Sequence, residues 1–557
     1  MHHLGCQYLC LFYSEVIFSK SLAKVGVFIY NINVVYYHTA RELFCAERMR
    51  GQLFLVAEIW GHIMFKIGFD NEKYLKLQSG QILERIASFG GKLYLEFGGK
   101  LFDDFHASRV LPGFAPESKI RMLMELKDQA EIVIVVSAPS IEQNKIRADL
   151  GITYDMDTLR LIDAFTGIGL YVGSVVITQY TSQPAADAFI KKLQNLGIKV
   201  YRHYPIPGYP SNAKLIASEE GCGKNDYIET ERSLVVVTAP GPGSGKMATC
   251  LSQLYHDNKR GIKSGYAKFE TFPIWNLALN HPVNIAYEAA TVDLSDLNMI
   301  DPFHLEAYGV TTVNYNRDVE IFPVLKLIFE GIYGECPYKS PTDMGVNMAG
   351  HCITDETAVK EAAKMEIVRR YYETLCKKRN GLADADEVCK LELLMNRAGV
   401  SVDDRRPVRA ALDRAAETEA PAMAIELPDG TVVTGKTTKL LGASAAALLN
   451  ALKVLGKIND DIHLIPPVII EPLSRLKTEN LGGHNPRLHA DEILIALAIS
   501  ATTNPLAAMA MKQLEKLRGA EAHATVILSA VDSSTYRKLG INLTMEPEYQ
   551  TKKLFHK

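Results

Sequence analysis

Residues 234–255 read LVVVTAPGPGSGKMATCLSQLY, and their pattern is the clearest indication of the fold. The apolar run at 234–238 predicts a buried strand, and Met247, Leu251 and Leu254 repeat at the spacing of one helix face. A glycine-rich loop lies between them. A strand, such a loop and a helix in this order bring free N–H groups and the positive end of the helix dipole to one point. The stretch therefore predicts an anion-binding loop.

The candidate binding residues lie in this loop and in the first helical turn. They are Gly241, Gly243, Ser244, Gly245, Lys246 and Thr249. In the phosphate-loop pattern G-x-x-x-x-G-K-[ST], backbone N–H groups and the lysine hold phosphate and the hydroxyl binds magnesium. Here Pro240 stands at the first glycine position and Met247 replaces the hydroxyl residue. The loop is thus predicted to bind an anion more readily than ATP specifically, and the alternative is a structural turn that packs a helix on a sheet.

A second segment, GTVVTGKT at 430–437, fits the phosphate-loop string better. Its middle residues are threonine and valine, which favour an extended strand over a tight loop. Gly430 belongs to a Pro-Asp-Gly turn that joins two strand-like runs, so the segment reads as a hairpin. We interpret the match, including Lys436, as accidental.

Other apolar runs place the glycine-rich loop in a larger sheet. They lie at 93–97, 131–136, 172–177 and 198–201, with helical spacing at 121–130 and 185–196. Unbroken apolar strands separated by helices predict a parallel sheet covered on both faces. Such sheets bind ligands at the carboxyl ends of their strands. The fold class is therefore α/β and multi-domain, with a Rossmann-like or P-loop-like N-terminal domain.

The secondary-structure pattern of the sequence changes twice further along the chain. Residues 354–416 are helical in spacing, with a stop near Asn380-Gly381, and strands and helices alternate again from about residue 422. We predict an α/β domain at 64–335, a helical domain at 336–420 and a C-terminal α/β domain at 421–557.

Composition excludes several classes of protein. The 557 residues are 47% hydrophobic and 22% charged, which argues against disorder, collagen and coiled coil. A net charge of −3 gives no overall attraction to nucleic acid. The nine cysteines form no C-x-x-C pair and H-E-x-x-H is absent, so we expect reduced thiols and no metal site.

Residues 1–63 differ from the rest in their many aromatic residues. Their longest uncharged run, at 25–40, has 16 residues, whereas a membrane-spanning helix needs about 20 apolar ones. No signal-peptide pattern is present. We expect this segment to be a non-native or disordered extension of a cytoplasmic protein.

Polar residues gather downstream of the loop, and we select Lys268, Asp301, His304 and Arg317 as catalytic candidates. Lys268 and Arg317 could pair with phosphate or carboxylate, and His304 could act as a general acid or base. The alternative is a long connection whose polar side chains satisfy one another.

Several segments carry a family resemblance. They are LYLEFGGKLFDDFHASRVLPGF at 93–114, the loop stretch above, KFETFPIWNL, NMIDPFHLEAYG, NYNRDVEIFPVL and SPTDMGVNMAG. From about residue 64 onward the chain resembles the bacterial uncharacterised protein family 0371, also called domain of unknown function 1846. The resemblance implies a cytosolic α/β protein with a helical insert and a C-terminal α/β subdomain. It implies no established activity, and it suggests that Pro240 and Met247 are normal for the family.

Two hypotheses for the function follow. In the first, the chain binds a nucleotide, as cofactor, or a phosphorylated metabolite at Gly241–Lys246 and transfers a phosphoryl or acyl-phosphate group. In the second, it is a non-catalytic binding or scaffold protein with a structural turn. We expect no nucleic-acid or membrane partner, and the sequence leaves a homo-oligomer open.

Overall fold

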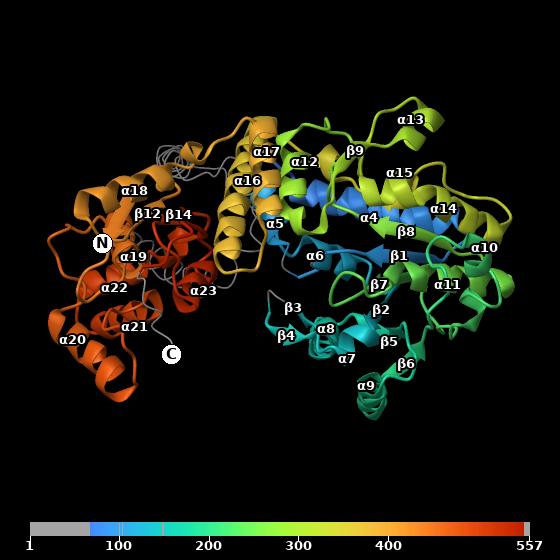
Figure 1. Ribbon diagram of the computed structural model, residues 1–557, viewed down its shortest axis with the longest axis horizontal. Coiled ribbons are helices and arrows are strands. Elements are labelled where there is room, and N and C mark those ends of the chain that lie inside the picture. Colours follow the sequence, from blue (N-terminus) through green and yellow to red (C-terminus); the bar gives the residue numbers. More distant parts are fainter. Residues whose placement is uncertain (1–66, 100, 103, 148–149, 551–557) are drawn as a thin grey trace, which may run out of the picture. The chain divides into compact units, whose positions relative to one another are not determined.

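A seven-stranded sheet organises the larger part of the described chain. The computed structural model describes residues 67–99, 101–102, 104–147 and 150–550, so the prediction for residues 1–63 lies outside them. The strands are β1 (Leu93–Phe97), β2 (Ala130–Ser137), β5 (Tyr171–Thr178), β6 (Lys199–Arg202), β7 (Leu234–Thr238), β8 (Gly265–Phe269) and β11 (Gly345–Val346). Their order is β11-β8-β1-β7-β2-β5-β6, and every pair is parallel (Figure 1).

Alternate side chains of the strands enter two different cores. Leu93, Leu95 and Phe97 of β1 face one core, and Tyr94 faces the other. Helices pack against both faces, as expected for a parallel sheet whose strands are apolar throughout. The first core includes residues of α4 (Asn71–Ser88), α5 (Phe105–Val110), α6 (Ser118–Glu125), α7 (Ala138–Glu142), α8 (Tyr154–Gly167) and α9 (Pro184–Asn195). The second includes residues of α10 (Ala213–Ile216), α11 (Lys246–Lys259) and α14 (Asn316–Tyr333).

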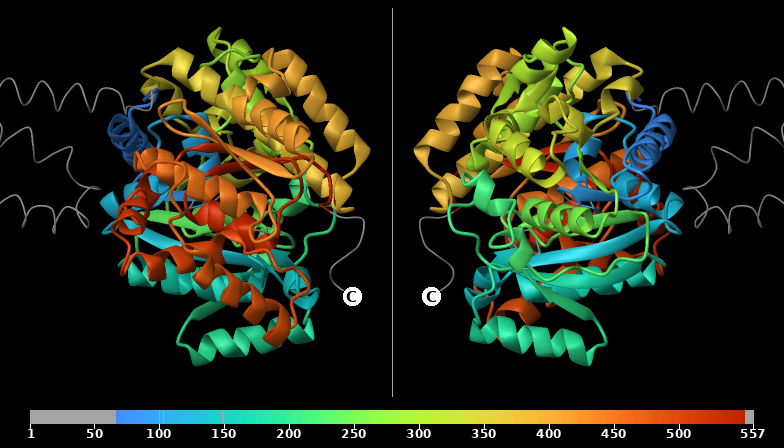
Figure 2. Two further views of the ribbon diagram at one scale, coloured as in Figure 1. Left: turned by 90° about the vertical axis from the view of Figure 1, so that its left-hand side faces the viewer. Right: turned by 90° about the vertical axis from the view of Figure 1, so that its right-hand side faces the viewer.

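The chain leaves two neighbouring strands toward opposite faces of this sheet. After β1 it continues through α5 and α6 on the first face to reach β2. After β7 it continues through α11 on the second face and passes β1 to reach β8. The boundary between β1 and β7 is therefore a topological switch point, the place where open α/β sheets bind ligands. At the far edge of the sheet lie β6 and α9, in teal (Figure 2).

Smaller elements complete this part of the chain. Two short antiparallel pairs join β9 (Asn298–Ile300) to β10 (Val313–Tyr315) and β3 (Ile146–Arg147) to β4 (Ile152–Thr153). Further helices are α12 (Pro282–Ala290), α13 (Pro302–Tyr308), α15 (Pro341–Met344), α16 (Glu356–Arg379) and α17 (Ala385–Ala398). Short 3-10 helices are η1 (Cys222–Lys224), η2 (Val292–Leu294), η3 (Ala349–Cys352) and η4 (Val402–Asp404). The predicted stop after the first long helix is confirmed, because α16 ends at the cap Asn380 and Gly381 follows with φ +73°.

A separate four-stranded sheet lies in the C-terminal part. Its order is β13 (Val432–Lys436), β12 (Ala422–Glu426), β14 (Glu521–Ala524) and β15 (Asn542–Met545), and only the last pair is parallel. A core of its own joins this sheet to the surrounding helices. The helices in this part are α18 (Arg406–Thr418), α19 (Ala443–Leu455), α20 (Pro467–Arg475), α21 (Ala490–Ser500), α22 (Pro505–Met511) and α23 (Ala530–Lys538), with η5 (Leu476–Asn480) and η6 (Leu514–Leu517). The predicted α/β class with a second sheet is thus confirmed, and the three domain boundaries stay predictions.

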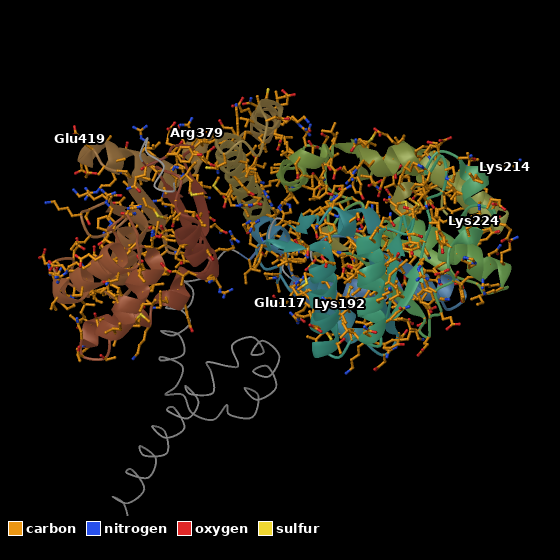
Figure 3. All side chains as sticks on the ribbon, turned by 60° about the horizontal axis from the view of Figure 1, so that its bottom comes forward. Glu117, Lys192, Lys214, Lys224, Arg379 and Glu419 are labelled. Carbon is orange, nitrogen blue, oxygen red and sulfur yellow. The ribbon has the colours of Figure 1, made fainter. Side chains whose placement is uncertain are left out.

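The surface carries charges of both signs. Figure 3 shows acidic and basic side chains interspersed over the described part, among them Lys192 and Lys224. None of the helices described is long and apolar enough to cross a bilayer.

Candidate functional site

The glycine-rich loop follows β7 directly and ends at the first residue of α11. Gly243 has φ +75° and Gly245, the N-cap of α11, has φ +91°. Most side chains disfavour this left-handed region, so both positions favour glycine. The predicted order of strand, loop and helix is confirmed.

Neighbouring side chains contact the loop and stabilise its conformation. The hydroxyl of Thr178, at the end of β5, donates a hydrogen bond of 2.7 Å to the carbonyl of Ser244. The Ser244 hydroxyl donates to the carbonyl of Gly241 at 2.9 Å. A Cβ on Gly241 would lie 2.2 Å from the hydroxyl oxygen of Tyr154, so the backbone passes directly against that ring. Ser244 therefore stabilises the loop with its side chain, and its contribution toward a ligand would be its backbone N–H.

The outer side of the loop presents hydrogen-bond donors without partners. In the part of the chain that the structure describes, no acceptor binds the backbone N–H groups of residues 243–248. The first turn of α11 has no acidic residue and no side-chain cap. A Cβ on Gly243 would meet no atom within 4 Å, so open space lies beside this residue. Free donors at a helix N-terminus facing open space can hold an anion.

Lys246 adds a positive charge to these donors. Its side chain is half-buried, and among the described residues no carboxylate forms an ion pair with it. Thr249, one turn later, is fully buried, and its hydroxyl has no hydrogen-bond partner in the described structure. Among the predicted binding residues, Lys246 thus lies beside the loop without an ion-pair partner in the described structure, whereas the Thr249 side chain is buried.

The neighbouring strand β1 ends in a second pair of glycines. Gly99 has φ +73°, and a Cβ on Gly98 would meet no atom within 4 Å. At the switch point, Gly98 thus follows β1 directly and Gly243 lies in the loop after β7, and a Cβ on either residue would meet no atom within 4 Å. This placement is what a ligand that approaches the backbone closely would require.

A buried group of charges lies at the carboxyl ends of β1 and β8. Glu96 and Lys268 are paired in register, and the Lys268 ammonium lies 2.5 Å from Asp318 Oδ2 and 3.3 Å from Glu270 Oε1. The Lys268 ammonium lies over the Tyr315 ring, 4.4 Å from the ring centroid. We call Glu96, Lys268, Glu270, Tyr315 and Asp318 the charged cluster.

Burial shifts the proton affinities in the charged cluster. It lowers the pKa of Lys268, but the carboxylates of Asp318, Glu270 and Glu96 outweigh it, so the net shift is upward. Burial raises the pKa of Glu270 to about 8, against the opposing charge of Lys268. Glu270 is then largely protonated at neutral pH. A protonated carboxyl beside an ammonium is a group that can donate a proton.

The loop and the charged cluster are neighbours through α11. Cys250, one turn after Lys246, is fully buried, and burial raises the pKa of its thiol. Glu96 raises that pKa further and Lys246 lowers it, so the charges of both reach this thiol. Glu96 also pairs in register with Val237 of β7, four residues before Gly241, so a ligand at the loop would lie at the same edge of the sheet as the charged cluster.

The other predicted catalytic residues lie around or beyond this cluster. Arg317 forms an ion pair with Asp296 at 2.6 Å and lies 5.6 Å from the Tyr315 ring, so Lys268 and Arg317 share one aromatic neighbour. Asp301 is fully buried, caps α13 and accepts the Thr342 hydroxyl at 2.6 Å.

His304, on α13, has partners outside the charged cluster. It lies 2.9 Å from the Ser340 hydroxyl and 3.7 Å from Asp343. The structure therefore brings together Lys268 and Arg317, and gives Asp301 and His304 partners of their own.

Four members of the charged cluster were absent from the residues selected on sequence: Glu96, Glu270, Tyr315 and Asp318. Glu96 had a readable signal, because it is the one charged residue in the apolar run LYLEF. A buried strand seldom holds an unpaired charge, so such a residue predicts a partner across the strands.

The segment at 430–437, which fits the phosphate-loop pattern better, contains a hairpin strand. Residues 432–436 form β13 and pair antiparallel with β12. A Cβ on Gly435 would lie 2.2 Å from the backbone nitrogen of Ala447, because α19 packs directly on the strand. This confirms the interpretation that Lys436 does not belong to a phosphate loop.

The fold and these sites define a multi-domain α/β protein with a glycine-rich loop at a topological switch point. Two family models match, "Domain of unknown function DUF1846, N-terminal" over residues 67–399 and its C-terminal counterpart over 403–555. A UPF0371 protein of Streptococcus thermophilus is 60% identical over 494 residues, which is 89% of this chain and all of that protein. One of Streptococcus pyogenes is 59% identical over the same length. The chain belongs to this uncharacterised bacterial family.

Proposed function

We propose that the chain binds a phosphate-bearing small molecule at the loop 239–245 and the first turn of α11. The observation that carries this proposal is the row of unpartnered N–H groups at residues 243–248 beside the unpaired Lys246. A phosphate group would satisfy several of these donors together and would neutralise the lysine. A structural turn alone would leave them facing open space.

The position of the loop supports the same assignment. It follows β7, next to the glycine pair that follows β1, at the switch point of the sheet. Met247 stands where a phosphate loop has its magnesium-binding hydroxyl. The proposal is therefore phosphate recognition by backbone and lysine, with a nucleotide or a sugar phosphate as the ligand class.

The charged cluster supports a transfer reaction as the accompanying chemistry. Lys268 would neutralise negative charge on a transferred phosphoryl group, and protonated Glu270 would supply a proton to the leaving oxygen. The acceptor would be a second small molecule bound beside the cluster. The class of reaction is phosphoryl or acyl-phosphate transfer.

Thermal melting in the presence of nucleotides, sugar phosphates and pyrophosphate tests the binding proposal. A ligand that binds only the folded chain raises the melting temperature in proportion to its saturation. We expect at least one phosphate compound to raise it, and the unphosphorylated parent compound to leave it unchanged. If none of the phosphate compounds acts, the alternative of a scaffold with a structural turn is favoured.

A further inference from the structure

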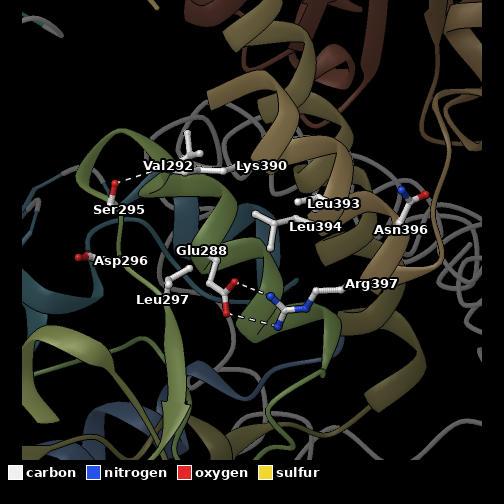
Figure 4. Close-up of a pocket in the computed structure, with 10 residues that line it drawn as sticks. All are labelled: Glu288, Val292, Ser295, Asp296, Leu297, Lys390, Leu393, Leu394, Asn396 and Arg397. Atoms are coloured by element: carbon white, nitrogen blue, oxygen red, sulfur yellow. Dashed lines mark hydrogen bonds and ion pairs between the residues drawn. The ribbon is translucent and has the colours of Figure 1, made fainter. Parts of the chain in front are cut away.

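A cavity of about 580 Å³ lies away from the glycine-rich loop, between α17 and the segment from α12 to β9 (Figure 4). Glu288 of α12, Val292 of η2 and residues 295–297 line one side, and residues of α17 line the other. The volume falls within the range of sites that hold small organic ligands, about 300–1,000 Å³.

The cavity surface is mostly apolar. Val292 and Leu394 are buried in its floor, whereas Leu297 and Leu393 at its mouth are 55% and 59% exposed. Large apolar side chains that gather at a hollow are a common mark of a ligand site. The apolar part of a ligand would cover these leucines.

Most of the charges that line the cavity neutralise one another. Arg397 donates to the buried Glu288 at 2.8 Å, and Asp296 is paired with Arg317 at 2.6 Å. Lys390 is different, because its ammonium contacts only the Ser295 hydroxyl, at 3.2 Å, among the described residues. The lining therefore carries one positive charge that no carboxylate compensates.

We propose that this cavity binds an amphipathic carboxylate, with its hydrocarbon part against Leu297, Leu393 and Leu394 and its carboxylate near Lys390. The apolar surface selects the hydrocarbon, and the uncompensated ammonium selects the sign of the head group. This site is separate from the glycine-rich loop, and the proposal does not depend on the function assigned to that loop.

Calorimetric titration with three ligands of equal chain length tests the sign of the head group. The ligands are decanoate, decanol and decylammonium, each below its aggregation concentration. We expect decanoate to bind at one site, decanol about two- to fivefold more weakly, and decylammonium more weakly still, as for a partly exposed ion pair. Equal binding of all three, or no saturable binding of decanoate, would overturn the proposal.

Two variants and two matched controls locate the site. Lys390→Gln should remove the difference between decanoate and decanol, and Leu393→Asn should weaken both by about fivefold or more because it removes apolar contact. Lys378→Gln and Leu382→Asn change exposed residues outside the cavity and should bind as the unmodified chain does.

The exposed leucines could instead contact a second copy of the chain, and size-exclusion chromatography distinguishes the two occupants. Three results together would show that the occupant is a second copy and that the proposal is wrong. The unmodified chain would elute as a dimer, Leu393→Asn would elute as a monomer, and decanoate would bind to neither.

Discussion

Replacing Lys246 with alanine should weaken phosphate binding without unfolding the chain. Its ammonium has no ion-pair partner among the described residues, so the folded state loses no ion pair. Surface changes of this kind alter the free energy of unfolding by about 0.5 kcal/mol or less. A charge-assisted hydrogen bond to phosphate contributes about 1.5–3 kcal/mol, and about 1.4 kcal/mol corresponds to a tenfold change in Kd. We therefore expect Kd to rise by roughly ten- to a hundredfold.

The assay is calorimetric titration at constant ionic strength with the phosphate compound that raises the melting temperature most. Lys246→Arg should keep most of the affinity because it keeps the charge. Lys436→Ala, on the outer end of β13, is the matched control and should bind as the unmodified chain does. If Lys246→Ala binds with unchanged Kd, the loop does not recognise phosphate through this lysine. If Lys436→Ala is the variant that loses affinity, the segment at 430–437 is the phosphate loop.

Three further predictions concern the loop, the charged cluster and the C-terminal part. Gly243→Asn should abolish phosphate binding in titrations while the melting temperature changes little. The fold should tolerate this change because asparagine accepts a left-handed backbone and a Cβ at this position meets no atom. Gly381→Asn, at φ +73°, is the control and should bind phosphate normally. The pKa of Glu270 is raised from 4.5 to about 8, so between these pH values the folded chain holds a proton that the unfolded chain releases, and stability falls as pH rises. Thermal melts of Glu270→Gln from pH 5 to pH 8 should lack this part of the decline. Identical slopes of melting temperature against pH for the variant and the unmodified chain would contradict the prediction. The pKa of Asp532 is lowered against burial by His489, and its carboxylate accepts hydrogen bonds from Ser444, Ala490 and Ser529 at the starts of α19, α21 and α23. Asp532→Asn should therefore reduce the free energy of unfolding by about 2–4 kcal/mol in urea titrations, and a change below about 1 kcal/mol would refute this role.

The sheet was readable from the sequence where strands are apolar throughout. The run at 131–136 lies within β2, whose residues are all buried, and the runs at 93–97 and 234–238 coincide with β1 and β7. A strand buried on both faces needs apolar side chains at every position, so its signal is strong and local. The glycine-rich loop was also readable, because its left-handed backbone angles at Gly243 and Gly245 favour glycine.

The polar side of the site was not readable in the same way. The short strand β8 holds Lys268, and its residues GYAKF lack a continuous apolar run, so it was not predicted. Helix α14 contains Pro323 and begins with polar residues, so it was not predicted from the sequence. Asp318 forms an ion pair with Lys268 and Glu96 lies beside it in register, and both are distant from Lys268 in sequence. Spacing along the chain carries no information about such contacts.

Phosphate binding at the glycine-rich loop can be tested in a crystal of the chain soaked in tungstate, a heavy-atom analogue of phosphate. We expect a tungsten anomalous peak within hydrogen-bond distance of the backbone nitrogens of residues 243–247 and near Lys246 Nζ. The same peak should be absent from crystals of Lys246→Ala or Gly243→Asn. Tungsten bound elsewhere, with an empty loop at a concentration that saturates the crystal, would contradict the claim that this loop binds phosphate.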